Sequence, residues 1–131
     1  MDTKKIKMKL KKILKDLGYH EGELSLLFTD DKHITELNRR FLEREGPTNV
    51  LAFPMRDDQN VAPKTLMLGD IVISLDTALR DAKRDGMSIE KTVDRLLIHG
   101  LLHLLGYDHE GSEQEARKME EETNRLFKMI G

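Results

Sequence analysis

The segment from Ser88 to His109 constrains the fold most, because it specifies a helix, the end of that helix and a turn. Ser88 can cap the start of the helix, and most residues from Ile89 to Leu105 are apolar. Gly106 can adopt the left-handed backbone conformation that ends a helix and turns the chain. The sequence therefore predicts a helix over residues 88–105, followed by a sharp turn.

Three of the chain's five histidines lie on this helix and the turn that follows. His99 and His103 are four residues apart, so on a helix they lie about 40° apart on one face. After a turn at Gly106, His109 can fold back toward the same point. Three imidazoles leave a fourth position open on a bound metal ion, which is the catalytic pattern. The alternative is a set of buried histidines that each form one hydrogen bond.

The sequence has no cysteine, so histidine, aspartate and glutamate are its available metal ligands. Histidine ligands without sulfur favour zinc, although nickel or another transition metal suits the same set. The spacing also matches the long zinc-protease signature, in which a glutamate follows the first histidine as general base. Gly100 occupies that place here. Because glycine cannot accept a proton from water, the sequence disfavours peptide hydrolysis by that mechanism.

The remaining periodicities predict an α+β domain that spans residues 1–131, with a small sheet and helices packed over it. In the second expected helix the apolar residues Ile34, Leu37, Phe41 and Leu42 should face inward, and Gly46-Pro47 should end the helix. Ser112 and Glu115 form a capping box for the last helix. The expected elements are helices over residues 6–17, 30–42, 74–83, 88–105 and 112–130, and strands over residues 24–28, 48–53 and 66–73, with a loop over residues 56–64. The strand over residues 66–73 is expected at the centre of the sheet.

Charge and hydropathy limit the classes of partner. The net charge of -2 argues against a protein that coats nucleic acid through bulk charge. Seven lysines between Lys4 and Lys15 form one basic cluster, so a polyanion-binding face stays open. No apolar run is long enough to cross a bilayer, and the first residues lack the pattern of a secretory signal. We therefore expect no membrane partner and a cytoplasmic location.

Three segments together resemble one known family. The run over residues 99–109, HGLLHLLGYDH, resembles the defining motif of the YbeY family of bacterial rRNA maturation factors. Residues 47–54, PTNVLAFP, and residues 68–74, LGDIVIS, resemble that family's two other signature segments, in the same order. Leu37-Asn38 and the aromatic residue Phe41 also fit. The similarity runs from about Leu37 to Glu110.

The resemblance implies a single-strand-specific, metal-dependent endoribonuclease that acts in rRNA processing and ribosome quality control. It implies maturation of the 3′ end of small-subunit rRNA, and contacts with the small ribosomal subunit and its assembly factors. It also implies zinc on His99, His103 and His109, and an α+β fold with a small mixed sheet.

One position departs from the family pattern. The family usually carries an arginine directly after the aromatic residue that follows Leu-Asn, and here that place is Leu42. Arg40 and Arg44 lie two residues to either side, and a guanidinium from either could hold a phosphate with two hydrogen bonds. The alternative for each arginine is a solvated helix face.

Two other functions share the histidine pattern. One is a metalloprotease-like hydrolase, which must take its general base from elsewhere. The other is a non-catalytic ribosome assembly factor in which the metal is structural. The sequence leaves open the general base, the product termini, the RNA cleavage site and the oligomeric state.

Overall fold

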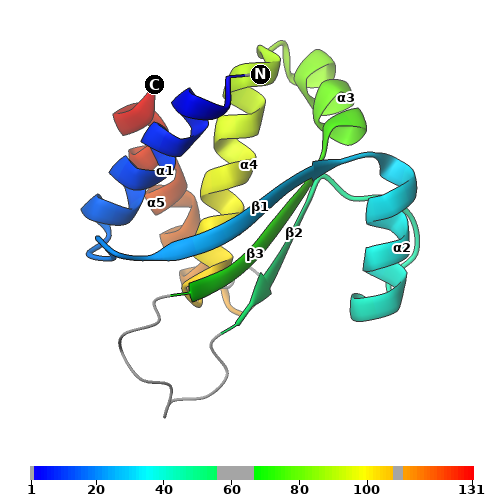
Figure 1. Ribbon diagram of the computed structural model, residues 1–131, viewed down its shortest axis with the longest axis horizontal. Helices are drawn as coiled ribbons and strands as arrows, with labels where there is room; N and C mark the ends of the chain where they lie inside the picture. Colours follow the sequence, from blue (N-terminus) through cyan, green and yellow to red (C-terminus); the bar gives the residue numbers. More distant parts are fainter. Residues whose placement is uncertain (1, 56–66, 108–110) are drawn as a thin grey trace.

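A computed structural model describes residues 2–55, 67–107 and 111–131 (Figure 1). Its α+β class confirms the expectation from the sequence, and each expected helix and strand is present. The expected loop over residues 56–64, the start of the third strand at Leu66, and His109 lie outside the described residues. The elements are α1 (Thr3–Asp16), β1 (Glu23–Thr29), α2 (Asp31–Leu42), β2 (Val50–Pro54), β3 (Met67–Ser74), α3 (Leu75–Asp85), α4 (Ile89–Leu104) and α5 (Glu113–Ile130).

The sheet is small and mixed, with the strand order β1-β3-β2. β3 pairs in parallel with β1 and antiparallel with β2, so the apolar strand predicted to be central is confirmed as the central one. β3 can be apolar on both faces because each face is covered: Ile71 and Ile73 join the main core, whereas Val72 packs on the other face.

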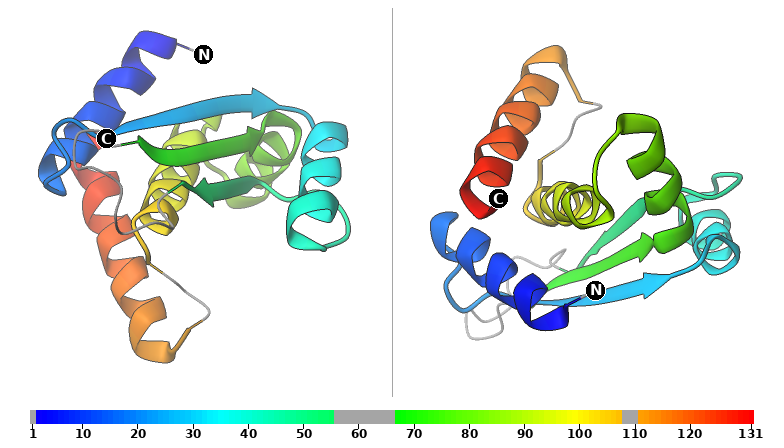
Figure 2. Two further views of the ribbon diagram at one scale, coloured as in Figure 1. Left: turned by 60° about the horizontal axis from the view of Figure 1, so that its bottom comes forward. Right: turned by 90° about the horizontal axis from the view of Figure 1, so that it is seen from above.

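The main core joins one face of the sheet to α1, α4 and α5. A smaller cluster joins the other face to α2, through Ile34, Leu51 and Val72. In Figure 2, α2 and α5 lie at opposite ends of the sheet. Of the chain's described helices, none has the length and apolar content required to cross a membrane.

Four helices begin after a capping residue, including the two caps predicted at Ser88 and Ser112. Asp30, Ser74, Ser88 and Ser112 each accept a hydrogen bond from a backbone N–H in the first turn of the helix that follows. These bonds satisfy N–H groups that otherwise have no partner inside the helix. Gly86 ends α3 in the left-handed conformation.

The predicted inward face of α2 is wrong at its C-terminal end. Phe41 is 59% exposed and Leu42 is 41% exposed, whereas Ile34 is fully buried. The helix ends at Leu42, and Glu43 takes a left-handed conformation with φ 54°, so the chain turns away before Gly46. Phe41 instead packs edge-on against Phe53, with ring centroids 5.7 Å apart.

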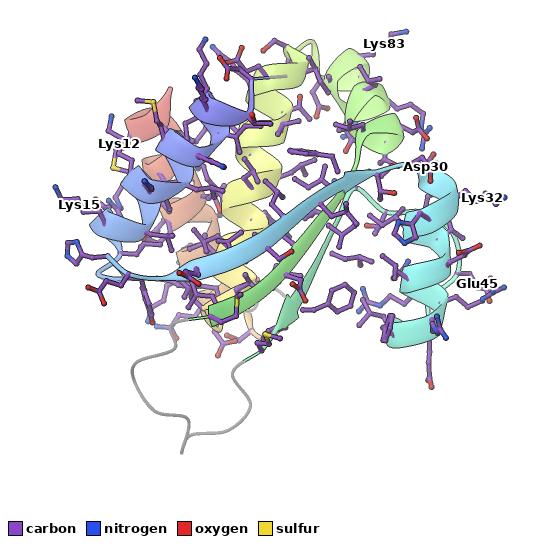
Figure 3. All side chains as sticks on the ribbon, in the orientation of Figure 1. Lys12, Lys15, Asp30, Lys32, Glu45 and Lys83 are labelled. Atoms are coloured by element: carbon purple, nitrogen blue, oxygen red, sulfur yellow. The ribbon has the colours of Figure 1, made fainter. Side chains whose placement is uncertain are left out.

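A partly buried ion pair connects α1 to α4. Lys9 Nζ lies 2.8 Å and 3.1 Å from the two carboxylate oxygens of Asp94, and Asp94 is only 3% exposed. The hydrogen bond to Asp94 raises the pKa of Lys9 above its ordinary value, although burial opposes the shift. Lys12 and Lys15 lie instead on the outer side of the helix, as Figure 3 shows.

Candidate metal centre

The candidate metal centre is built on α4. Its two histidines, His99 and His103, are one helical turn apart and both half-buried. Their Nε2 atoms lie 3.1 Å apart, and their ring centroids are 4.6 Å apart at an interplanar angle of 74°. The helical spacing therefore brings the two ring nitrogens to one point, as the sequence predicts.

This geometry fits a shared metal ion. Zinc–nitrogen bonds of about 2.1 Å in a tetrahedral arrangement place two ligand nitrogens about 3.4 Å apart. The observed separation of 3.1 Å is close to that value. A hydrogen bond between two neutral imidazoles is the other arrangement that this distance permits.

The end of α4 supplies the predicted turn. Gly106 has φ 99°, and the N–H of Tyr107 donates to the carbonyl oxygen of Leu102 at 3.0 Å. This bond and the left-handed glycine together reverse the chain direction after the helix. His109 follows the turn but lies outside the described residues, so its place as the third ligand stays a prediction.

Gly100 lies on the side of α4 that faces the sheet. A Cβ atom on residue 100 would come to 3.0 Å from Ile71 Cγ2 and 3.3 Å from Val50 Cγ2. The side-chain position that a zinc protease uses for its glutamate is therefore directed into the packed core here. This packing adds a structural reason for the glycine to the chemical argument from sequence.

A cleft of about 390 Å³ opens beside the two histidines. One wall is strand β2, and another is the segment that follows α2. The described residues that line the cleft include one arginine, Arg44, and no carboxylate. The lining residues are Leu42, Arg44, Thr48, Asn49, Val50, Leu51, Ala52, Pro54, His99, Gly100 and His103.

The structure separates the two candidate arginines. Arg44 lines the histidine cleft, whereas Arg40 is absent from its described lining and lies 6.0 Å from the centre of the Phe41 ring. Leu42 also lines the cleft. Of the two candidates, Arg44 is therefore the one placed to contact a substrate beside the histidines.

Asn38 shapes the segment that carries Arg44. It is 4% exposed, its carbonyl oxygen accepts a hydrogen bond from Arg44 N at 3.2 Å, and its Nδ2 donates to the carbonyl oxygen of Gly46 at 3.1 Å. These bonds hold both sides of the turn after α2. Sequence reasoning identified Asn38 only as part of the Leu37-Asn38 pair that fits the family pattern, because its hydrogen-bond partners depend on where the helix ends.

Asn49 joins the histidine cleft to a second cleft. Its Nδ2 donates to Asp81 Oδ2 on α3 at 3.1 Å, rather than to the backbone. The second cleft measures about 470 Å³ and shares Asn49 and His99 with the first. Its other lining residues include Arg84 and Arg95, which the sequence does not connect to the site because α3 and α4 come together only through tertiary packing.

Comparisons with known proteins agree with the three signature segments. The family model described as Endoribonuclease YbeY matches residues 1–131. The Endoribonuclease YbeY of Syntrophotalea carbinolica is 47% identical over 120 residues, which cover 91% of this chain and 80% of the relative. The Endoribonuclease YbeY of Aquifex aeolicus is 42% identical, and the match covers 95% of this chain and 89% of the relative.

The fold has a solved counterpart. The solution structure of a protein from Thermotoga maritima matches with a TM-score of 0.69 and 27% sequence identity, and the match covers 97% of this chain and 79% of that one. The fold, the signature segments and the relatives lead to the same assignment. This chain belongs to the YbeY family of endoribonucleases, which are hydrolases that act on RNA.

Proposed function

We propose that this chain is a zinc-dependent endoribonuclease that cleaves single-stranded RNA in the cleft beside His99 and His103. The observation that carries the proposal is the 3.1 Å separation of the two Nε2 atoms, at the side of a cleft whose described lining contains an arginine and no carboxylate. Such a cleft attracts a polyanion rather than a cation. Membership of an endoribonuclease family identifies the polyanion as RNA.

The proposed ligands are His99, His103 and His109. Neutral imidazoles suit zinc, and three of them leave one coordination position for solvent or substrate. When bound, zinc would supply a Lewis acid for a phosphoryl oxygen and lower the pKa of a coordinated water. Because His99 and His103 lie on one helix, the protein holds these two proposed ligands close together before the metal ion binds.

Arg44 is the proposed phosphate contact. Its guanidinium can hold a phosphodiester with two parallel hydrogen bonds and stabilise charge that develops on the phosphoryl oxygens. Arg44 thus takes the role that the family arginine would have at Leu42. Asn38 positions it through the turn after α2.

We infer that the substrate is small-subunit rRNA, and that one domain over residues 1–131 processes its 3′ end in the cytoplasm. Ribosome quality control, and contact with the small subunit and its assembly factors, follow from this substrate. Peptide hydrolysis is less well supported, because residue 100 faces the core and no carboxylate occurs among the described lining residues.

The test compares His99→Ala, His103→Ala and His109→Ala with His20→Ala, a matched control because His20 is exposed and lies outside the cleft. Bound metal and cleavage of a single-stranded RNA are measured on each purified protein. We expect the three variants to lose both properties and His20→Ala to keep both. Equal RNA cleavage by all the variants would refute the proposal, and metal loss without any RNA cleavage by the parent protein would support a structural metal in an assembly factor.

A further inference from the structure

Strand β2 lies next to the histidines, and one of its edges has no partner strand among the described residues. It is an outer strand of the sheet that the described residues form, and it pairs with β3 on one side. Val50, Ala52 and Pro54 line the same cleft as His99 and His103. The outward edge of β2 is therefore a wall of the candidate site.

The pairing register shows which backbone groups point into the cleft. Ser74 N donates to the carbonyl oxygen of Asn49 at 2.9 Å, and Met55 N donates to that of Leu68 at 3.1 Å. Residues of an antiparallel strand alternate between bonding to the partner and pointing away from it. Odd-numbered residues from 49 to 55 thus bond to β3, whereas residues 50, 52 and 54 direct their backbone groups outward.

The sequence of β2 agrees with this register. Proline lacks an N–H and occurs in strands where that group would point away from the ladder. Pro54 occupies one of the outward positions and pairs with Gly69. Val50 and Ala52 occupy the other two, and each presents an N–H donor beside a C=O acceptor in the plane of the sheet.

We propose that the edge of β2 at Val50 and Ala52 binds the Watson–Crick edge of an unpaired RNA base. A base presents a donor beside an acceptor on that edge, and proteins that recognise single-stranded RNA bond to it. A base in a duplex already uses the same groups for pairing, so this site would select single strands. The inference rests on the proposed function, because it assigns the position of the RNA in the same cleft.

The surroundings favour RNA over an extended peptide, which is the other ligand that a strand edge can bind. Arg44 lines the cleft and can contact the phosphate next to a bound base, and the described lining offers no carboxylate to repel it. The side chain of Ala52 is small and packs against the main core, so it leaves the outward edge open.

The protein variant for the test is Ala52→Pro, which removes the outward N–H and keeps the bonds of the ladder. Ala52→Ser is the matched control, because it retains the N–H at similar size. Binding of a fluorescent oligouridylate to the metal-loaded protein is measured without following cleavage. We expect about tenfold weaker binding by Ala52→Pro than by Ala52→Ser, which is the effect of losing one hydrogen bond to a ligand. Bound metal and the melting temperature verify the fold of both variants.

The RNA variant tests the same contact on the unaltered protein, so the proposal stays testable if Ala52→Pro does not fold. In an oligomer of N3-methyluridine, the methyl group blocks the Watson–Crick edge of each base. In an oligomer of 5-methyluridine, the same methyl group leaves that edge intact. We expect about tenfold weaker binding of the N3-methyl oligomer alone. Equal binding of the two oligomers would overturn the inference. It would also be overturned if a short extended peptide displaced the N3-methyl and 5-methyl oligomers equally well from the protein. Neither result bears on cleavage by His99→Ala, which tests the proposed function separately.

Discussion

Gly100 in α4 and Ile71 in β3 are in such close contact that a Cβ atom on residue 100 would lie 3.0 Å from Ile71 Cγ2. This distance is shorter than ordinary van der Waals contact between carbon atoms. The missing side chain lets the helix approach the sheet, and the approach brings His99 and His103 beside β2. The glycine between the histidines therefore sets the distance between the metal centre and the strand edge.

Gly100→Ala should lower the free energy of unfolding by about 1–2 kcal/mol, because overpacking outweighs the gain in helix propensity. The measurement is urea unfolding of the four members of a double-mutant cycle with Ile71→Ala. In the Ile71→Ala background, which removes Cγ2, the same substitution should be neutral or stabilising. Equal effects in both backgrounds would show that the contact with Ile71 is not the cause.

Arg44→Gln should reduce the rate of RNA cleavage about 10²-fold, because it removes a charged donor from the transferring phosphate. Arg40→Gln is the matched control from outside the described cleft lining, and it should change the rate less than about threefold. Steady-state cleavage of one fluorescent oligonucleotide by both variants checks the prediction. The reverse order of effects would transfer the phosphate contact to Arg40.

His109→Ala should weaken zinc binding strongly. Loss of a residue that only orients a metal ligand typically weakens binding by a factor of about 10–100, and the loss at His109 should exceed this factor. The reason is that the variant would keep two protein ligands of three. Competition with a chromophoric chelator measures the affinity, and His20→Ala should match the parent protein. A smaller loss than this factor would mean that His109 supports the centre without binding the metal.

Lys9→Met should destabilise the protein by about 3–5 kcal/mol, because it leaves the buried carboxylate of Asp94 without its ion-pair partner. Lys12→Met, on the solvated side of the same helix, should cost less than about 0.5 kcal/mol. The double variant Lys9→Met/Asp94→Leu should recover most of the loss, since it removes both charges. Thermal unfolding of all three proteins tests this, and an equal loss in the two single variants would contradict it.

Asp31 should make stability depend on pH in the acid range. Burial raises the pKa of Asp31, but hydrogen bonds from Ser74, Thr77 and Arg80 outweigh this effect and hold it below the ordinary value. A lowered pKa in the folded state means that the stabilisation is complete above the unfolded pKa of about 3.9, and is lost as the pH falls through the folded value.

The comparison is between the parent protein and Asp31→Asn in urea unfolding at several pH values. Asp31→Asn should cost about 2 kcal/mol at pH 7, where hydrogen bonds to the charged carboxylate are lost. The difference should shrink as the pH falls below about 4. A difference that stays constant with pH would mean that the carboxylate charge contributes nothing to stability.

Local signals in the sequence account for most of the elements. The Ser74, Ser88 and Ser112 caps and the left-handed Gly86 mark helix ends because these effects act within one turn of the chain. The histidine spacing predicts the 3.1 Å approach of His99 and His103 for the same reason: both lie on one rigid helix.

Features that depend on the packing of distant segments were not predictable. The sequence left Arg40 and Arg44 equivalent, and a left-handed backbone at Glu43 separates them. A glutamate gives no signal for that conformation, which is more usual for glycine or asparagine. The bond from Asn49 to Asp81 likewise depends on how α3 packs beside the start of β2, which local patterns do not contain.

The parallel pairing of β1 with β3 determines when this protein can fold during its synthesis. Phe28 pairs with Ile73, so β1 gains its sheet partner only after α2, β2 and β3 have left the ribosome. Closing so long a loop is slow compared with forming a hairpin. Until then the apolar side of β1 is available to other chains, and early folding should depend on how fast β3 is translated.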